Sequence, residues 1–230
     1  WLEIEIYKDG DIYTQRFERG NIKTNLEIVG KTEKTGTLVR FKPDAEIFKE
    51  TTEFDFEILK TRLRAQAFLN AGIHIQISDE RDPDHIICEN FCYEGGISSF
   101  VEYLNKKKAV ELVHPDIIHF STVADDDQAT AEVAMQYNDS YNELILSFAN
   151  NIHTTDGGTH EEGFKRSLTR VMNDYARKYN LLKDSDKNLT GDDVREGLTV
   201  VISIKVKDAQ FEGQTKAKLG NTEISGLVSN

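Results

Sequence analysis

The segment 213–221, Gly-Gln-Thr-Lys-Ala-Lys-Leu-Gly-Asn, places two primary amines, an amide and a hydroxyl between glycines. A lysine ammonium on a flexible stem can reach into an anion site, and phosphate is the usual anion at such sites. The segment follows a β-patterned run, Leu198 to Val206, and is too polar to belong to a core. An isolated Lys-Xaa-Lys is more often part of a solvated loop. Taken alone, these residues leave a phosphate contact and a solvated loop both open.

Two other groups of polar residues resemble metal ligands but have simpler explanations. His153, His160 and Glu161 lack a helical or hairpin register that would bring them to one ion, and we expect His160 on the surface of a helix's first turn. Three consecutive carboxylates, Asp125 to Asp127, predict a solvated hairpin turn. We therefore predict no metal site.

Composition narrows the class of protein. The chain has 230 residues, of which 38% are hydrophobic and 30% charged, enough for one or two globular domains. No apolar run reaches the roughly 18 residues that a transmembrane helix needs, so we expect no membrane partner. The net charge of −12 argues against general nucleic-acid binding, and any DNA contact must come from a local basic patch or from parts outside this sequence.

Cysteine usage and the start of the chain add two expectations. Cys88 and Cys92 lie four apart in a predicted strand, which leaves a disulfide or metal pair open, but no second Cys or His pair lies nearby at zinc spacing. Reduced thiols in a cytoplasmic protein are the default expectation. The sequence starts at Trp1 with neither a methionine nor a signal peptide, and we interpret it as part of a longer protein.

The first section of the chain predicts strands with one helix. Apolar residues alternate over 2–7, Asp9-Gly10 is a hairpin-turn signal, and 12–17 supplies the return strand. Thr52 and Asp55 predict a capping box for a helix that ends at Gly72, with Phe56, Leu59, Leu63 and Ala67 on its buried face. Further strands are predicted at 26–29, 38–41, 73–77 and 85–93.

Glu94-Gly95-Gly96 is the best candidate for a domain boundary, and helices and strands follow it. A helix over 97–106 ends in three lysines, which complement the helix dipole. Thr159 predicts the N-cap of a long helix whose face carries Phe164, Leu168, Met172, Tyr175 and Tyr179, and Thr190 with Asp193 predicts the cap of a short one. Strands are predicted near 117–123, 131–137, 143–148 and 199–206.

Four motifs, in this order along the chain, resemble a known family. They are Lys-Thr-Gly-Thr at 34–37, Tyr-Glu-Gly-Gly at 93–96, Asp-Gly-Gly-Thr-His-Glu at 156–161, and Gln-Thr-Lys-Ala-Lys-Leu-Gly-Asn at 214–221. Together they resemble the ATPase region of the ATP-binding subunits of bacterial type II topoisomerases, DNA gyrase and topoisomerase IV, over essentially the whole chain. The resemblance implies an α+β fold. Residues 1–95 would be the C-terminal part of a GHKL ATPase sandwich, a mixed sheet with helices on one face, and residues 96–230 an α+β transducer domain.

The resemblance also implies roles for individual residues in an ATP pocket. Lys216 and Gln214 match residues that contact the terminal phosphate of ATP. Thr37 matches a residue at the floor of the adenine pocket, where Gly36 allows close backbone approach and Val39 lines the wall. Lys8 stands where the family usually has an arginine that aminocoumarin antibiotics contact, and Thr37 is implied to contact the same inhibitors. Because a lysine cannot make the planar bidentate contact of an arginine, the affinity for these drugs is in doubt. Without the resemblance, Thr35-Gly36-Thr37 is an ordinary turn.

DNA contact is the second implied role. Lys165, Arg166 and Arg170 form a basic stripe that would line a DNA cavity between two subunits, although a solvated helix face remains an equal alternative. The family's catalytic glutamate, its magnesium ligand and its glycine-rich ATP lid have no counterpart in this sequence. We therefore predict no catalytic residue in this chain, and ATP and Mg²⁺ as cofactors of the intact protein.

The favoured interpretation is the part of DNA gyrase B that couples ATP binding and hydrolysis to dimer closure and DNA strand passage. The implied partners are DNA, gyrase A in a tetramer with two copies of each protein, a second copy of gyrase B, and aminocoumarin inhibitors. The same region of the corresponding topoisomerase IV protein, and a non-catalytic interaction module, remain alternatives.

Overall fold

The computed structural model describes residues 1–125 and 128–230, so Asp126 and Asp127 of the predicted acidic turn lie outside the described residues. The chain forms two compact units, Trp1–Phe56 and Glu57–Asn230, which are described separately. The predicted domain boundary after residue 95 stays a prediction.

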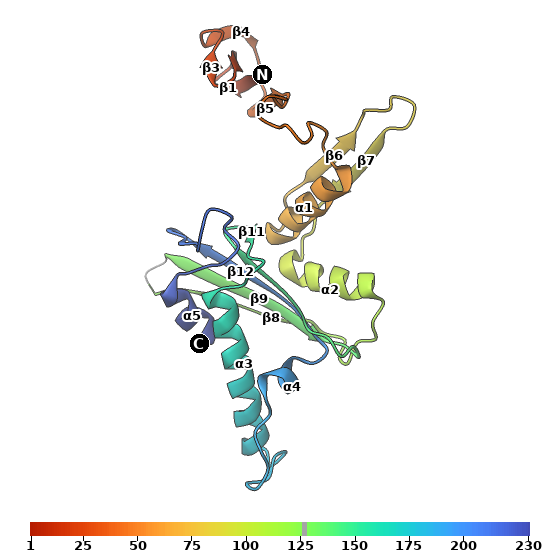
Figure 1. Cartoon of the computed structure of the whole chain (residues 1–230), viewed down its shortest axis with the longest axis vertical. Helices are drawn as coiled ribbons and strands as arrows, with labels where there is room; N and C mark the ends of the chain where they lie inside the picture. Colours follow the sequence, from red (N-terminus) through yellow and green to blue (C-terminus); the bar gives the residue numbers. More distant parts are fainter. Residues whose placement is uncertain (126–127) are drawn as a thin grey trace. The chain divides into compact units, whose positions relative to one another are not determined.

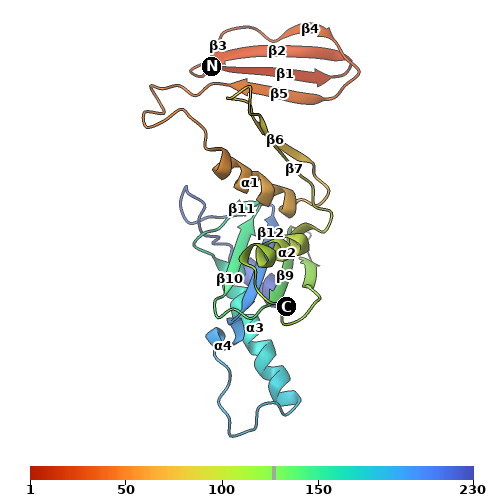
Figure 2. The same ribbon diagram turned by 90° about the vertical axis from the view of Figure 1, so that its right-hand side faces the viewer.

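The first unit is a five-stranded sheet, drawn along its length in Figure 2. β1 (Leu2–Lys8) pairs on one side with β2 (Asp11–Glu18) and on the other with β5 (Gly36–Phe41), while β3 (Asn21–Ile22) and β4 (Glu27–Lys31) both pair with β2. Every one of these pairings is antiparallel. The predicted first hairpin is confirmed: Asp9 and Gly10 both take positive φ, 55° and 84°, as a tight hairpin turn requires.

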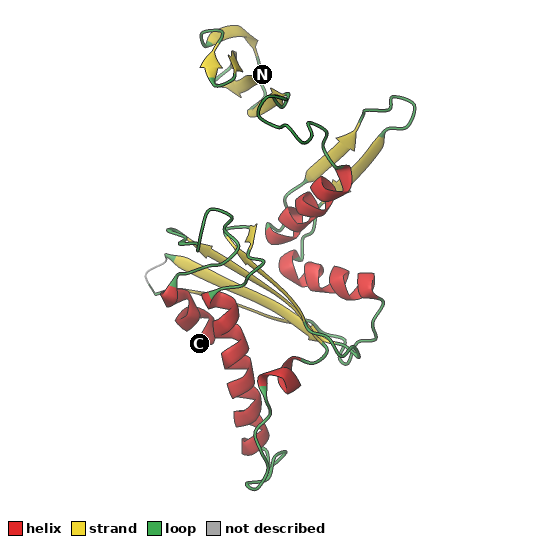
Figure 3. Ribbon diagram, in the orientation of Figure 1, coloured by secondary structure: helices red, strands yellow, loops and turns green. Residues whose placement is uncertain are grey.

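The second unit combines a mixed sheet with helices (Figures 1 and 3), so the predicted α+β class is confirmed. Its five-stranded sheet has the order β11-β10-β12-β9-β8; only the β10–β12 pair is parallel. A separate hairpin joins β6 to β7. The strands are β6 (Ile75–Asp79), β7 (Ile87–Phe91), β8 (Ile118–Val123), β9 (Ala129–Tyr137), β10 (Leu144–Ala149), β11 (Ile152–His153) and β12 (Leu198–Val206). The helices are α1 (Phe56–Leu69), α2 (Gly96–Lys108), α3 (Thr159–Lys178), α4 (Gly191–Arg195) and α5 (Thr222–Ser229).

β12 is the centre of this unit, and a separate core packs on each face of its sheet. On one face Val200, Ile202 and Ile204, all 0% exposed, pack with residues of α3 and α5. On the other face Val201 packs with Phe68 of α1 and with Phe100 and Val101 of α2. A strand buried on both faces explains the continuous β-branched run in its sequence.

Helix starts depend on more than local signals, and two predicted caps are wrong. α1 begins at Phe56, so Thr52 is not its cap, and its buried residues are Ala67, Phe68 and Leu69 rather than a face along its length. The N-cap of α3 is Gly158, and the Thr159 hydroxyl instead donates to the carbonyl of Asn221 at 2.6 Å. The capping box of α4 is confirmed, with Thr190 and Asp193 bonded reciprocally.

The buried face of α3 leaves the predicted stripe in the last turns, where Asn173 and Ala176 are buried instead. Phe164 and Leu168 are buried and Met172 packs against the same core, but Tyr175 and Tyr179 are 55% and 54% exposed. Their rings contact each other, with centroids 4.4 Å apart. Figures 1 and 3 show the reason: the last turns of α3 extend beyond the edge of the sheet.

Candidate functional site

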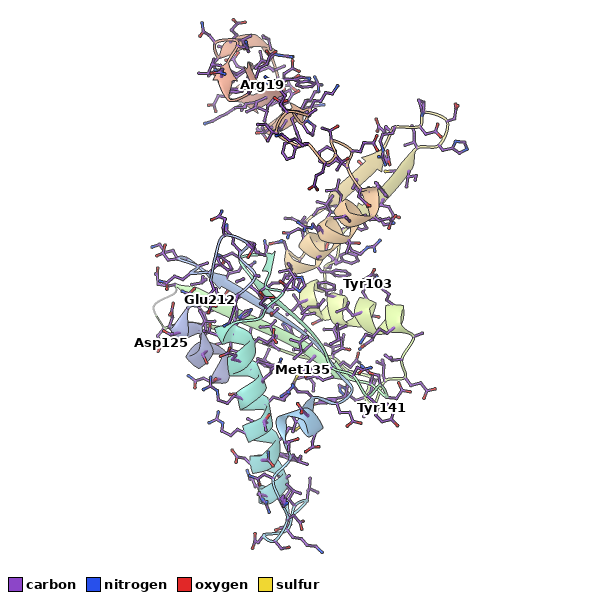
Figure 4. All side chains as sticks on the ribbon, viewed as in Figure 1. Arg19, Tyr103, Asp125, Met135, Tyr141 and Glu212 are labelled. Atoms are coloured by element: carbon purple, nitrogen blue, oxygen red, sulfur yellow. The ribbon has the colours of Figure 1, made fainter. Side chains whose placement is uncertain are left out.

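The candidate phosphate loop, residues 213–221, has a closed base and an exposed tip. A bridge between Phe211 and Leu219 closes the base, and the backbone N–H of Glu212 donates to the carbonyl of Lys218 at 2.9 Å. Gln214, Thr215 and Lys216 at the tip are all exposed. Figure 4 labels Glu212 on the approach to this loop. The arrangement holds the ends of the loop and leaves its polar side chains free to contact a ligand.

Contrary to the sequence expectation, the base of this loop belongs to the core. Leu219 is 0% exposed and joins the core between the sheet and α3. Asn221 is 2% exposed; its side chain accepts from the N–H of Gln210 at 2.7 Å and donates to the carbonyl of Asp208 at 3.1 Å. The high proportion of polar residues hid the single leucine that anchors the loop.

The two lysines of the loop have different surroundings. Lys218 Nζ lies 3.2 Å from the Glu212 carboxylate, so its charge is partly compensated. Lys216 has positive φ, 56°, and its Nζ lies 5.9 Å from the centre of the Phe211 ring. Among the described residues, none forms a salt bridge with Lys216. An exposed cation without a carboxylate partner is the better anion-binding candidate of the two.

A second segment, 156–159, pairs with the loop through its backbone. Asp156 N–H donates to Ala217 O at 2.9 Å, Leu219 N–H donates to Gly157 O at 3.1 Å, and Thr159 N–H donates to Leu219 O at 3.1 Å. Gly158 has φ 136°, and a Cβ at this position would lie only 2.4 Å from the carbonyl oxygen of Leu219. Close backbone approach thus explains Gly158, and the positive φ of 70° explains Gly157. They were the only sequence signal for this pairing.

In the first unit, strand register gathers the predicted nucleotide and inhibitor residues on one face. Thr37 lies opposite Ile6 and Val39 opposite Ile4, and Lys8 is two residues beyond Ile6 along β1. Because side chains alternate along strands, Lys8, Thr37 and Val39 share the Ile4–Ile6 face. Val39 is 51% exposed. Gly36 starts β5 with φ 150° and open space where a Cβ would stand.

The opposite face of that sheet is charged. Arg40 lies 3.3 Å from Glu5, and Arg16 lies 2.5 Å from Glu3 on the same face. The face with Thr37 is therefore the apolar one, as an adenine-binding wall would need. Gln214 and Lys216 belong to the second unit, Glu57–Asn230.

The predicted basic stripe of α3 divides into two parts. Arg166 donates to Ser225 Oγ at 2.8 Å and Arg170 to the Ser229 carbonyl at 3.3 Å, so both lie along α5. Lys165 instead lies 2.8 Å from Glu161 and 3.8 Å from Glu143. Lys165 thus forms the salt bridges expected of a solvated helix face. Arg166 and Arg170 have no carboxylate partner within the described part of the chain.

His160 is not on the helix surface, which corrects the sequence expectation. Its side chain is 0% exposed, and Nε2 lies 3.1 Å from Thr154 Oγ1. Burial lowers its pKa to about 4, so the ring is neutral at pH 7. Burial also lowers the pKa of His153. No three metal-ligating side chains among the described residues are grouped to hold an ion.

Comparison with known proteins identifies close relatives over the entire chain. A family model described as DNA gyrase B matches residues 96–230. The DNA gyrase B protein of Bacillus mycoides is 54% identical over 229 residues, which cover 100% of this chain and 55% of that protein. The chain spans only about a third of other curated relatives.

Two solved structures have the same fold. The 43K ATPase domain of Thermus thermophilus gyrase B, in complex with an aminocoumarin, is 36% identical with a TM-score of 0.82, over 100% of this chain and 60% of that one. The ATP-binding domain of Francisella tularensis topoisomerase IV, in complex with a small-molecule inhibitor, is 30% identical with a TM-score of 0.79, over 99% and 60%. Within the described residues, no helix is long and apolar enough to cross a membrane.

Proposed function

This chain belongs to the DNA gyrase B family, and from that membership we propose that it couples ATP binding to DNA strand passage in a type II topoisomerase. The intact protein would be an ATP-hydrolysing DNA gyrase that introduces negative supercoils. Residues 1–95 would complete the ATP-binding domain, and residues 96–230 would be the transducer that converts nucleotide binding into dimer closure.

The main support for this proposal is Lys216, an exposed cation without a carboxylate partner among the described residues, on a loop anchored in the core. In the proposed mechanism Lys216 donates a charge-assisted hydrogen bond to the terminal phosphate of ATP, and Gln214 donates a second. Each such bond contributes roughly 1.5–3 kcal/mol. Because ADP lacks the terminal phosphate, the two nucleotides would favour different positions of the loop.

Thr37, Gly36 and Val39 would form one wall of the adenine site. Val39 would pack against the base, the hydroxyl of Thr37 would take part in polar contacts, and Gly36 would let the backbone approach the ligand. Lys8 and Thr37 share the same face and would contact aminocoumarins, the class of inhibitor bound by the Thermus thermophilus relative.

Nucleotide and metal chemistry would divide between this chain and the rest of the protein. This chain would supply phosphate and adenine contacts, and family membership assigns Mg²⁺ and the catalytic base of the intact protein to residues outside this sequence. When bound, ATP with Mg²⁺ would supply the phosphoanhydride whose hydrolysis resets the cycle. The residues of this chain would bind and orient the nucleotide without hydrolysing it.

The remaining partners follow from the same proposal. The intact protein would work in the bacterial cytoplasm as a tetramer with two copies of gyrase A, dimerising through its ATPase region. Arg166 and Arg170 would face DNA in the cavity, and Lys165 would add to the local potential. The equivalent part of topoisomerase IV is the second candidate, because the ATP-binding domain of that enzyme from Francisella tularensis is 30% identical to this chain.

Substitution of Lys216 by alanine in the intact protein tests the proposal, with Lys218→Ala as the matched control. Lys216→Ala should reduce ATP-dependent supercoiling and ATPase activity by at least about tenfold, the loss of one charge-assisted bond. Lys218→Ala, which removes an equal charge two residues away, should have less than about a twofold effect. Equal effects of the two substitutions would refute the assignment to Lys216.

Calorimetry with a non-hydrolysable ATP analogue tests the division of the pocket. This chain alone should not bind the analogue, whereas the intact protein should bind it tightly in the presence of Mg²⁺. Comparable binding by the chain alone would mean that the site lies wholly within these 230 residues.

A further inference from the structure

Four polar side chains form a cluster around residues 156–159, the segment whose backbone is hydrogen-bonded to the phosphate loop. Ser147 comes from β10, Thr154 from the turn after β11, and His160 and Glu161 from the first turn of α3. Ser147, Thr154 and His160 are 1%, 2% and 0% exposed. Burying three polar side chains costs free energy unless each is hydrogen-bonded, so the connections within the cluster decide its role.

The hydrogen bonds assign the proton of His160. Thr154 Oγ1 donates to the Ser147 carbonyl at 2.8 Å, so it meets His160 Nε2, 3.1 Å away, as an acceptor. Nε2 therefore carries the proton. Nδ1 is buried without a hydrogen-bond partner among the described residues, which costs less for a bare nitrogen than for an N–H group. His160 is thus a neutral donor with one defined orientation.

Glu161 extends the cluster toward the helix surface. Its Oε2 accepts from Ser147 Oγ at 2.9 Å, and its Oε1 lies 2.8 Å from Lys165 Nζ. Gly157, two residues before the helix, lies so close that an added Cβ would be 3.0 Å from Glu161 Oε2. Both ends of the 154–161 segment are therefore held by the cluster.

The phosphate loop is bonded to the middle of that same segment. The Thr154 carbonyl accepts from Gly157 N–H at 2.9 Å, and residues 156–159 exchange three backbone hydrogen bonds with Ala217 and Leu219. Lys216 immediately precedes Ala217. A change in the position of residues 154–160 would therefore move the backbone next to Lys216, because these hydrogen bonds connect the two segments directly.

We propose that His160 and Thr154 are positioning residues for the terminal-phosphate contact of Lys216. The inference rests on the function proposed for this loop. Neither residue touches the nucleotide: the Nε2–H···Oγ1 bond fixes the turn between β11 and α3, and this turn fixes the loop. A sensor that is held in place loses less conformational freedom on binding, so affinity for the terminal phosphate depends on this bond.

Paired substitutions at each position separate the hydrogen bond from packing. The amide N–H₂ of His160→Gln can occupy the place of Nε2 and keep the donor, whereas that of His160→Asn can only occupy the place of Nδ1. Thr154→Ser keeps the hydroxyl, whereas Thr154→Val replaces it with a methyl group of similar size. A role in packing alone would make the larger change in volume, Thr154→Ser, at least as harmful as Thr154→Val.

The informative measurement is the ratio of dissociation constants for ADP and for a non-hydrolysable ATP analogue, determined at pH 7.5 with the intact protein. The ratio should fall at least about threefold in His160→Asn and Thr154→Val. This fall is part of the roughly 10- to 100-fold in affinity that one charge-assisted hydrogen bond to the terminal phosphate provides. ADP affinity should not change. His160→Gln and Thr154→Ser should remain within about twofold of the wild type. An unchanged ratio in folded His160→Asn and Thr154→Val would overturn the proposal.

A double-mutant cycle distinguishes this inference from the proposed function. In a Lys216→Ala background, His160→Asn should produce no further change in the ratio, because its effect passes through Lys216. If Lys216→Ala itself leaves the ratio unchanged, the proposed phosphate contact fails. If Lys216→Ala lowers the ratio but the His160 and Thr154 variants do not, only the positioning role fails. An additive effect of His160→Asn in the Lys216→Ala background would also refute it.

Discussion

Acidification should destabilise this protein through His160, because the folded state resists its protonation. Burial lowers the pKa of His160 to about 4 from 6.5, while attraction to Glu161 acts in the opposite direction. The unfolded chain therefore takes up the proton first. The stability that depends on the neutral ring is complete above pH 6.5 and is lost as the pH falls from about 6.5 to about 4.

The magnitude follows from the difference between the two pKa values. One pKa unit corresponds to about 1.4 kcal/mol, so the free energy of unfolding should fall by about 3 kcal/mol between pH 7 and pH 4 through this residue. That is a large share of the roughly 5–15 kcal/mol that stabilises a typical domain. The side chain is fully buried in the fold, so solvent does not screen this effect.

A comparison with His160→Gln isolates the contribution, because glutamine keeps the donor but does not titrate. In urea unfolding at pH 7, 5 and 4, the wild type should lose about 3 kcal/mol more free energy of unfolding than the variant between pH 7 and pH 4. All other ionisable groups are the same in the two proteins, so their contributions cancel in the comparison. Unfolding should be followed by circular dichroism, since the single tryptophan, Trp1, lies in the other unit. Parallel pH dependence of the two proteins would refute the reasoning.

Three further substitutions test other parts of the fold. Gly158→Ala should lower the unfolding free energy by about 2–5 kcal/mol and displace the phosphate loop, because its Cβ would overlap the Leu219 backbone; urea melts and amide exchange at 217–219 report both effects. Phe68→Ala should cost about 3–5 kcal/mol in urea melts, since the ring is 1% exposed and stacks on Tyr93 and Phe100; no loss would mean that this core is absent. Thr190→Ala should cost about 1 kcal/mol by removing the α4 cap, an effect that Thr190→Ser should largely avoid.

Local sequence patterns were sufficient for most elements. The Asp9-Gly10 hairpin, the β-branched run of β12 and the capping box of Thr190 each involve neighbours a few residues apart, and all three are confirmed. The candidate phosphate loop was also visible as a motif, and its contact with phosphate stays a prediction. Such signals are readable because turn geometry and side-chain periodicity depend on residues close in sequence.

Tertiary structure alone decided what those elements bury. His160 and Leu219 looked like surface residues because their neighbours in sequence are polar, yet contacts across the fold make both fully buried. Tyr175 and Tyr179 continue a regular helical stripe, but they are exposed because α3 extends beyond the sheet that would cover them. The bonds between 156–159 and 217–219 join segments about 60 residues apart, a pairing that no local pattern encodes.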